Sequence, residues 1–152
     1  MKTHRLTELA RRAERELARR LRESNTARLF GFELDAVEPG RAVVRMPVRP
    51  RHRQVHGVVH GGILAALADT AGGLAAYMSA PKGTRMATVE MKINYLEPVE
   101  KGTLAAEARV LRLGRNLVVV EADVRDESRK LVAKALMTFA MGPREVPRRG
   151  GD

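Results

Sequence analysis

Residues 61–80 read GGILAALADTAGGLAAYMSA, and this stretch decides the fold. Seven alanines and four glycines surround a single charged residue, Asp69. A transmembrane helix is disfavoured, because a central carboxylate among so many small residues makes insertion into lipid costly. A helix that is apolar on nearly all sides is instead expected to lie buried inside a sheet-rich domain.

Strand patterns flank this helix on both sides. Residues 32–48 predict two strands joined by a turn at Glu38-Pro39-Gly40, and four more strands are predicted at 86–96, 102–113, 116–125 and 131–141. Along the first of these four, apolar and polar residues alternate, so the two sets are expected on opposite faces. The apolar set is Val89, Met91, Ile93 and Tyr95, and the polar set is Thr88, Glu90, Lys92 and Asn94. Two strands, one long helix and a four-stranded meander predict an α+β fold in which an antiparallel sheet covers one helix.

Residues 7–21 predict an amphipathic helix with a strongly basic polar face. Its apolar residues recur every three or four positions: Leu9, Ala10, Ala13, Leu17 and Leu21. Such a helix either packs on the domain or a neighbouring subunit, or binds a membrane surface or a polyanion. We therefore divide the chain into this basic helix (1–24), one domain (25–142) and a tail expected to be disordered (143–152).

Length and composition narrow the class of protein. The 152 residues suit one domain, and the lack of cysteine excludes disulfides and thiol chemistry and favours the cytoplasm. Residues 1–22 contain no apolar stretch typical of a secretory signal. The formal net charge of +10 indicates an anionic partner, such as nucleic acid, acidic lipid or a phosphorylated cofactor. Aromatic residues are only 3% of the chain, which disfavours single-stranded nucleic acid.

Two features of the 61–80 helix could carry chemistry. An isolated carboxylate at Asp69 must be paired, be neutralised or face a wet cavity, and such groups concentrate at functional sites. At the start of the helix, His60-Gly61-Gly62 leaves backbone N–H groups uncovered at the positive end of the helix dipole, where they can polarise a carbonyl oxygen. The structural alternatives are a carboxylate that bonds neighbouring backbone and glycines that only ease packing.

The spacing of these two features has a geometric consequence. Gly61 and Asp69 are eight residues apart, which is ~12 Å along one helix at 1.5 Å per residue. A single helix therefore cannot bring both groups to one carbon atom. If they act together, the carboxylate must come from a second copy of the helix across a twofold axis.

His52, His56 and His60 recur at intervals of four, which on a helix would align three metal ligands. The residues between them are poor helix formers, and no carboxylate is nearby in the sequence. We therefore predict no metal site.

The stretch from Gln54 to Gly62, QVHGVVHGG, followed by Leu64, Leu67, Ala68, Asp69 and Gly73, resembles the central motif of hotdog-fold acyl-CoA thioesterases of the PaaI-like, phenylacetate-degradation group. Residues 91–98 and Gly114-Arg115 are similar to that family's following strands. The resemblance covers roughly residues 30–141. It implies a hotdog fold and a cytoplasmic hydrolase of aryl- or short- to medium-chain acyl-CoA, which needs no cofactor beyond the coenzyme A of its substrate.

Carried over by position, the resemblance implies that Gly61 polarises the thioester carbonyl and that Asp69 of the partner subunit acts as nucleophile or general base. His60 would support the loop or contact the thioester region, and Thr88 would help to orient water. The loop backbone, with Gln54 or His60, would hold the acyl thioester. Gln54 stands where PaaI-like members usually have Asn and resembles the glutamine of aryl-CoA thioesterases, which generally have Glu in place of Asp69; Gly73 lacks the hydroxyl that some of those enzymes carry. The implied assembly is a homodimer with shared sites, arranged as a homotetramer.

Some of the excess basic residues would then bind the phosphates of coenzyme A. Gly62 would lie beside the substrate. The candidate phosphate-binding residues are Arg115, Arg112 and Lys92, although an ordinary solvated surface charge explains each equally well. Two alternatives stay open: another hotdog enzyme such as a hydratase or dehydratase, and a non-catalytic acyl-CoA sensor. One N-terminal helix is too little for a helix-turn-helix reader of DNA, so we expect no nucleic-acid partner.

Overall fold

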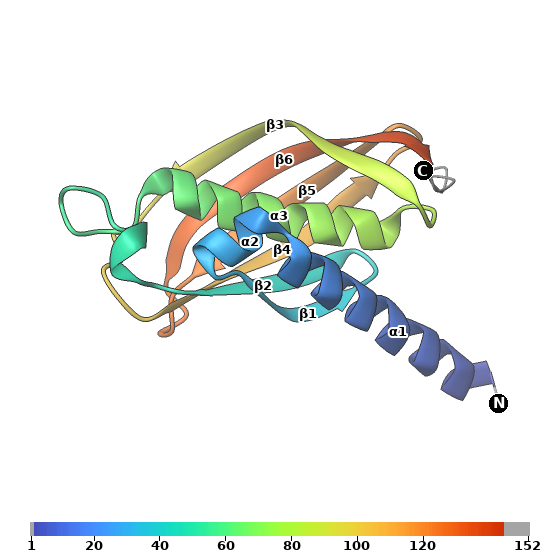
Figure 1. The fold of residues 1–152 in the computed structure, drawn as a ribbon. Helices are drawn as coiled ribbons and strands as arrows, with labels where there is room; N and C mark the ends of the chain where they lie inside the picture. The colour runs from blue at the N-terminus through green and yellow to red at the C-terminus, as the bar shows by residue number, and fades with distance from the viewer. Residues whose placement is uncertain (1, 145–152) are drawn as a thin grey trace, which may run out of the picture.

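A six-stranded antiparallel sheet curves around one long helix in the computed structural model, which describes residues 2–144 and, within them, the side chains of 11 and 13–143 (Figure 1). The helices are α1 (Lys2–Glu23), α2 (Asn25–Phe30) and α3 (Gly61–Ser79), with a 3₁₀ turn, η1, at Pro50–His52. The strands are β1 (Glu33–Glu38), β2 (Arg41–Pro47), β3 (Thr84–Tyr95), β4 (Thr103–Leu113), β5 (Leu117–Arg125) and β6 (Leu131–Arg144). The predicted hotdog fold is confirmed.

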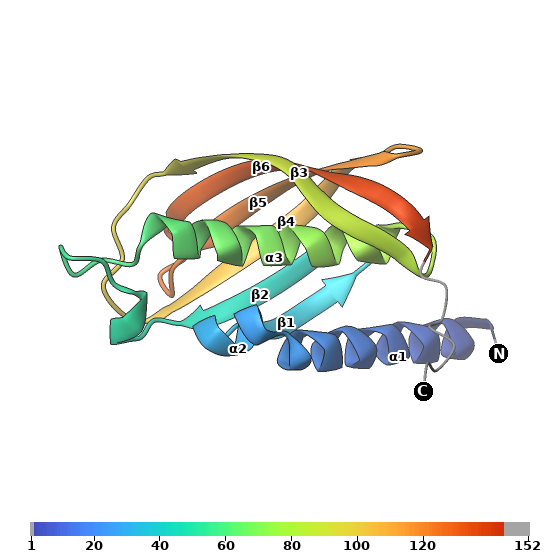
Figure 2. The same ribbon diagram turned by 45° about the horizontal axis from the view of Figure 1, so that its top comes forward.

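The strand order across the sheet is β1-β2-β4-β5-β6-β3. The expected four-stranded meander is therefore wrong in one respect. β4, β5 and β6 follow one another, but β3 crosses to the far side of β6 and forms an edge of the sheet. The helix between β2 and β3 explains this order, because α3 carries the chain across the concave face before β3 begins (Figure 2).

The core lies between α3 and the sheet. The buried residues of α3 are Leu64, Leu67, Ala68, Ala71, Gly72, Ala75 and Ala76, and they recur at helical spacing on the face toward the strands. The opposing sheet face offers Val44, Met46, Val120 and Met137, each fully buried. Small residues on the helix let the sheet approach closely, which is why alanine and glycine dominate residues 61–80.

The register of β3 departs from the sequence prediction at its middle. Thr88 pairs with Phe139 and Glu90 pairs with Thr138, so Val89 is an extra residue in a β-bulge. Simple alternation would put Thr88 on the outer face together with Glu90. The bulge instead leaves Thr88 on the inner face, toward α3, and leaves Val89 59% exposed.

The N-terminal helix packs against β1 through its C-terminal half, where Leu17 and Leu21 are buried. α1 is longer than the predicted segment 7–21. Strand β6 continues to Arg144, two residues past the predicted domain end, and the rest of the predicted tail lies outside the described residues. Among the described helices, none combines the length and the hydropathy that crossing a lipid bilayer requires.

Candidate functional site

Asp69 and Thr88 form a direct side-chain pair between α3 and β3. The Thr88 hydroxyl donates a hydrogen bond of 2.7 Å to Asp69 Oδ1. The carboxylate is half-buried on the helix face that turns toward β3 rather than toward the core. Its second oxygen makes no hydrogen bond within the described chain, so the group remains able to attack or to accept a proton.

A cleft of about 450 Å³ contains this pair. Besides Asp69 and Thr88 it is lined by Ser24, the N-cap of α2, and by residues of α1, α3, β3 and β6, namely Leu17, Arg20, Leu21, Thr70, Gly73, Leu74, Tyr77, Thr84, Arg85, Met86 and Phe139. Its volume is in the range of small-molecule sites, and most of its walls are apolar. A reactive carboxylate at an apolar cleft is the arrangement expected of an enzyme that acts on a largely apolar group.

The other candidate centre is the N-terminus of α3. His60 is the N-cap residue in an extended conformation, and its Nδ1 accepts a hydrogen bond of 2.9 Å from the Gly62 N–H. The Gly62 amide, predicted to lie beside the substrate, is therefore already satisfied. The Gly61 N–H is at the first helical position, has no partner within the helix, and is the donor left for a ligand.

Tyr95, at the end of β3, lies against this helix start. A β-carbon added at Gly61 would lie 3.0 Å from the Tyr95 Cζ, so a side chain at position 61 would press on the ring. Two features therefore favour glycine at position 61: its amide stays uncovered, and an aromatic ring approaches closely. The same strand thus contacts both centres, through Thr88 at one and Tyr95 at the other.

Gln54 lies in a tight loop that projects from the α3 N-terminal end of the molecule (Figure 1). Its N–H donates to Val58 O, and Gly57 with a φ of +83° donates back to Gln54 O. The side-chain Oε1 accepts from the His56 N–H at 2.5 Å, which holds the amide group within the loop. Gln54 is thus near the Gly61 centre in the chain and does not line the Asp69 cleft.

His52, His56 and His60, which recur every four residues in the sequence, do not lie on one helix. His52 is fully buried at the end of η1, His56 is exposed in the loop, and His60 caps α3. Burial, followed by the charges of Arg51 and Arg49, lowers the pKa of His52, against a raising effect from the Phe30 backbone. Its Nδ1 accepts from the Arg49 N–H, so His52 fastens the loop from inside.

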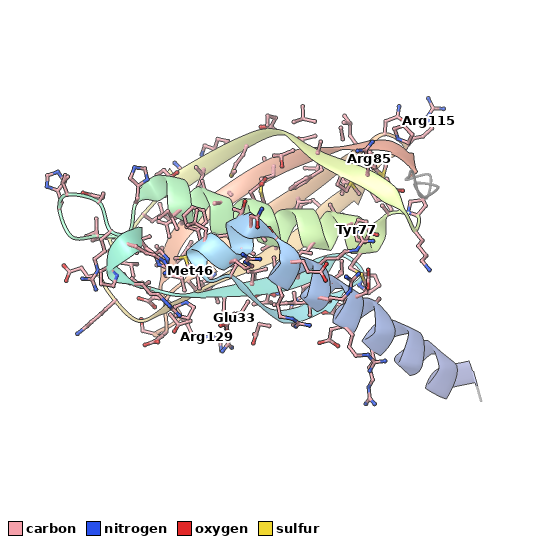
Figure 3. The ribbon with its side chains drawn as sticks, in the orientation of Figure 1. Glu33, Met46, Tyr77, Arg85, Arg115 and Arg129 are labelled. Carbon is pink, nitrogen blue, oxygen red and sulfur yellow. The ribbon has the colours of Figure 1, made fainter. Side chains whose placement is uncertain are left out.

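The predicted phosphate-binding residues are scattered. Lys92 donates to Asn94 on β3, and Arg112 is exposed on β4. Only Arg115 lies by a cleft close to the site, because Thr84 lines both that cleft and the one containing Asp69. Figure 3 shows Arg115 and Arg85 at the same corner of the molecule.

Arg20, Arg85 and Tyr95 also lie at the two centres, and none of them was predicted as a site residue. Arg20 belongs to the polar face of an amphipathic helix, and no sequence pattern could place that face beside Asp69. Arg85 comes three residues before Thr88 on β3, so plain alternation would place the two on opposite faces, and the sequence gives no sign that Arg85 lines the cleft. Tyr95 was predicted only as a member of the apolar set of its strand, and its contact with Gly61 depends on the fold.

Comparisons with known proteins point to one family. The sequence pattern of the Thioesterase superfamily matches residues 56–133, a segment that includes both centres. Thioesterase HI1161 of Haemophilus influenzae is 32% identical, and its crystal structure superposes with a TM-score of 0.76 over 84% of this chain and 89% of that one.

Two further proteins are similar over most of their length. The 1,4-dihydroxy-2-naphthoyl-CoA hydrolase of Listeria monocytogenes is 31% identical over 112 residues, which span 74% of this chain and 91% of the hydrolase. The PaaI protein of the phenylacetic acid degradation operon of E. coli is 26% identical, with a TM-score of 0.82 over 90% of this chain and 97% of that protein.

Proposed function

Because the chain belongs to the thioesterase superfamily, a family of thioester hydrolases, we propose that it hydrolyses acyl-CoA thioesters to a free acid and coenzyme A. The observation that carries this proposal is the Asp69–Thr88 pair in a cleft lined by apolar residues. The carboxylate supplies the base or nucleophile, and the cleft receives the acyl group. The PaaI-like subgroup, the phenylacetate pathway, the homotetramer and the cytoplasmic location stay predictions.

Asp69 has two chemically balanced routes. As nucleophile, its oxygen adds to the thioester carbon, expels the coenzyme A thiolate and leaves a mixed anhydride that water cleaves. As general base, it takes a proton from a water molecule that attacks the same carbon. In both routes negative charge grows on the carbonyl oxygen, and the Gly61 N–H at the positive end of α3 is suited to stabilise that charge.

We further propose that each active site joins Asp69 of one subunit to Gly61 of another. Both groups lie on α3, eight residues and about 12 Å apart, so one chain cannot apply both to a single carbonyl. The edge strand β3 supports such a dimer, because its outer side has unpaired backbone groups and carries exposed Val89 and Tyr95. A second copy placed along this edge by a twofold axis would complete two equivalent sites.

For the phosphates of coenzyme A we favour Arg85 and Arg115 over Lys92 and Arg112. Arg85 lines the Asp69 cleft, and Arg115 lines the adjoining one. Neither makes an ion pair within the described chain, whereas arginines such as Arg41 are paired on the outer sheet face. Their charges are therefore available to an anion at the mouth of the site.

The direct test measures the release of free thiol from acetyl-, octanoyl-, phenylacetyl- and palmitoyl-CoA by the purified full-length protein. We expect turnover of at least one of them at a rate typical of enzymes, roughly 1–10³ s⁻¹. Binding of acyl-CoA without any thiol release would contradict the proposal and support a sensor instead. A misfolded preparation, which would give no turnover for a trivial reason, is recognised by a circular dichroism spectrum that lacks the α+β signature.

Thr88 is expected to position the Asp69 carboxylate. Thr88→Val removes the 2.7 Å hydrogen bond without changing side-chain size, and hydrogen bonds to charged groups contribute enough to slow turnover roughly ten- to a hundredfold. The matched variant Thr88→Ser retains the hydroxyl and should recover most of the rate. Equal kcat values for the Val and Ser variants would show that the hydroxyl has no such role.

A further inference from the structure

Two adjacent glycines interrupt α3 one turn after Asp69, and packing explains only one of them. Glycine weakens a helix interior relative to alanine, so each position needs a reason. A methyl group at Gly72 would lie 2.7 Å from the Met137 Cε, within the packed core. A methyl group at Gly73 would lie 3.6 Å from the Phe139 Cε1, which is an ordinary contact. Packing therefore gives a reason for glycine at 72 but none for glycine at 73.

Gly73 lines the cleft that contains Asp69. Asp69, Gly73 and Tyr77 are spaced four residues apart and so share one face of α3, and all three line this cleft. The distance along the helix axis from Asp69 to Tyr77 is about 12 Å. A missing side chain at 73 thus keeps the floor of the cleft open between the carboxylate and Tyr77.

Helix α1 forms the opposite wall. Its residues Leu17 and Leu21 line the same cleft, together with apolar residues of the other elements, namely Leu74, Met86 and Phe139. Arg20 lies over the Tyr77 ring, 5.6 Å from its centre, and marks the end farthest along the helix from Asp69. Figure 3 places Tyr77 toward the C-terminal end of α3, where α1 runs past it.

We propose that this cleft is an acyl channel, in which Gly73 and the α1 wall set the largest acyl group that the site accepts. The inference rests on the proposed thioesterase function and narrows its substrate to aryl or medium-chain acyl thioesters. When the carbonyl carbon of the substrate lies at Asp69, its acyl group extends along the apolar walls toward Tyr77. An acetyl group would leave those walls uncovered, whereas an octanoyl or phenylacetyl group would bury them.

Gly73→Ala tests the floor of the channel. One added methyl group in an apolar pocket changes discrimination by roughly 10- to 200-fold. We therefore expect the ratio of kcat/KM for octanoyl-CoA to that for acetyl-CoA to fall at least tenfold relative to the parent. The melting temperature should stay the same or rise, because alanine favours the helix and meets no clash at this position.

Leu17→Ala tests the opposite wall and should act in the other direction, raising kcat/KM for palmitoyl-CoA relative to octanoyl-CoA. The matched control is Leu104→Ala, which truncates an equally buried leucine of β4 that does not line the cleft. Unchanged ratios in both Gly73→Ala and Leu17→Ala, or an equal change in Leu104→Ala, would overturn the channel.

Binding of non-hydrolysable thioether analogues of acetyl-CoA and octanoyl-CoA, measured by calorimetry, separates this inference from the proposed function. A parent protein that binds the octanoyl analogue at least tenfold more tightly, with that preference lost in Gly73→Ala, supports the channel even if no thioester is cleaved. Hydrolysis by a parent protein that binds both analogues equally supports the function and overturns the channel.

Discussion

Asp69→Asn is expected to lower thioester turnover by roughly 10²–10⁴-fold while the protein stays folded. The amide keeps the size and polarity of the side chain and can still meet the Thr88 hydroxyl, but it can neither accept a proton nor attack a carbonyl carbon. Free-thiol release under saturating substrate gives the change in kcat. The melting temperature and the affinity for a thioether analogue show that fold and binding persist.

Two results would remove Asp69 from the mechanism. Turnover within about threefold of the parent corresponds to less than about 1 kcal/mol of barrier, too little for a nucleophile or base. An equal loss in Thr70→Val, a change to the neighbouring residue of the same cleft whose hydroxyl bonds the Ala66 carbonyl, would indicate a general disturbance of α3 instead.

Mixing two inactive variants, Asp69→Asn and Gly61→Pro, is expected to restore about a quarter of the parent's active sites. Random exchange of subunits makes about half of the dimers hybrids, and each hybrid has one site with both defects and one with neither. Proline removes the Gly61 N–H at a position where a helix can begin with proline. The extended His60 before it, with φ −63° and ψ 133°, already has the backbone that precedes proline.

Tyr95 makes a control for the proline variant necessary. Any β-carbon at position 61 presses on the Tyr95 ring, so Gly61→Pro changes both the amide and this contact. Gly61→Ala makes the same contact but keeps the N–H, and the half-exposed ring has room to turn aside. We expect Gly61→Ala to retain far more activity than Gly61→Pro. No recovery in the mixture, despite exchange shown by native mass spectrometry, would place the whole site within one subunit.

The order and extent of the elements could be predicted closely from local patterns. The run of small residues predicted the bounds of α3 to within one residue, because a helix that is apolar on all sides is stable only when it is buried in the core. The strands followed from alternation and turn residues, with ends displaced by only a few residues. The position of β3 beside β6 could not be predicted, since strand pairing is non-local and alternation says nothing about neighbours.

The candidate site could likewise be predicted only where its features are local in the sequence. Asp69 and the His60-Gly61 helix start were evident because a lone carboxylate and uncovered amides are local features of one helix. Occupation of the Gly62 amide by His60 depends on a side-chain rotamer that the sequence does not specify. The contributions of Arg20 and Tyr95 depend on segments that meet only in the folded chain, which is why spacing along the sequence gave no sign of them.

The extra residue in β3 makes the geometry of the site depend on chain length as well as on side-chain identity. On either side of Val89 the strand follows opposite phases of in–out alternation, so Thr88 and Met91 face the same way although three positions separate them. Plain alternation over the present number of residues would turn the Thr88 hydroxyl from α3 toward the outer face, and the bulge is what prevents this. Loss of one residue between Thr88 and Met91 would remove the bulge and leave both side chains facing α3. One residue added to this short segment, with the single bulge retained, would therefore turn Thr88 away from Asp69, whereas the same insertion in a hairpin turn lengthens only a loop.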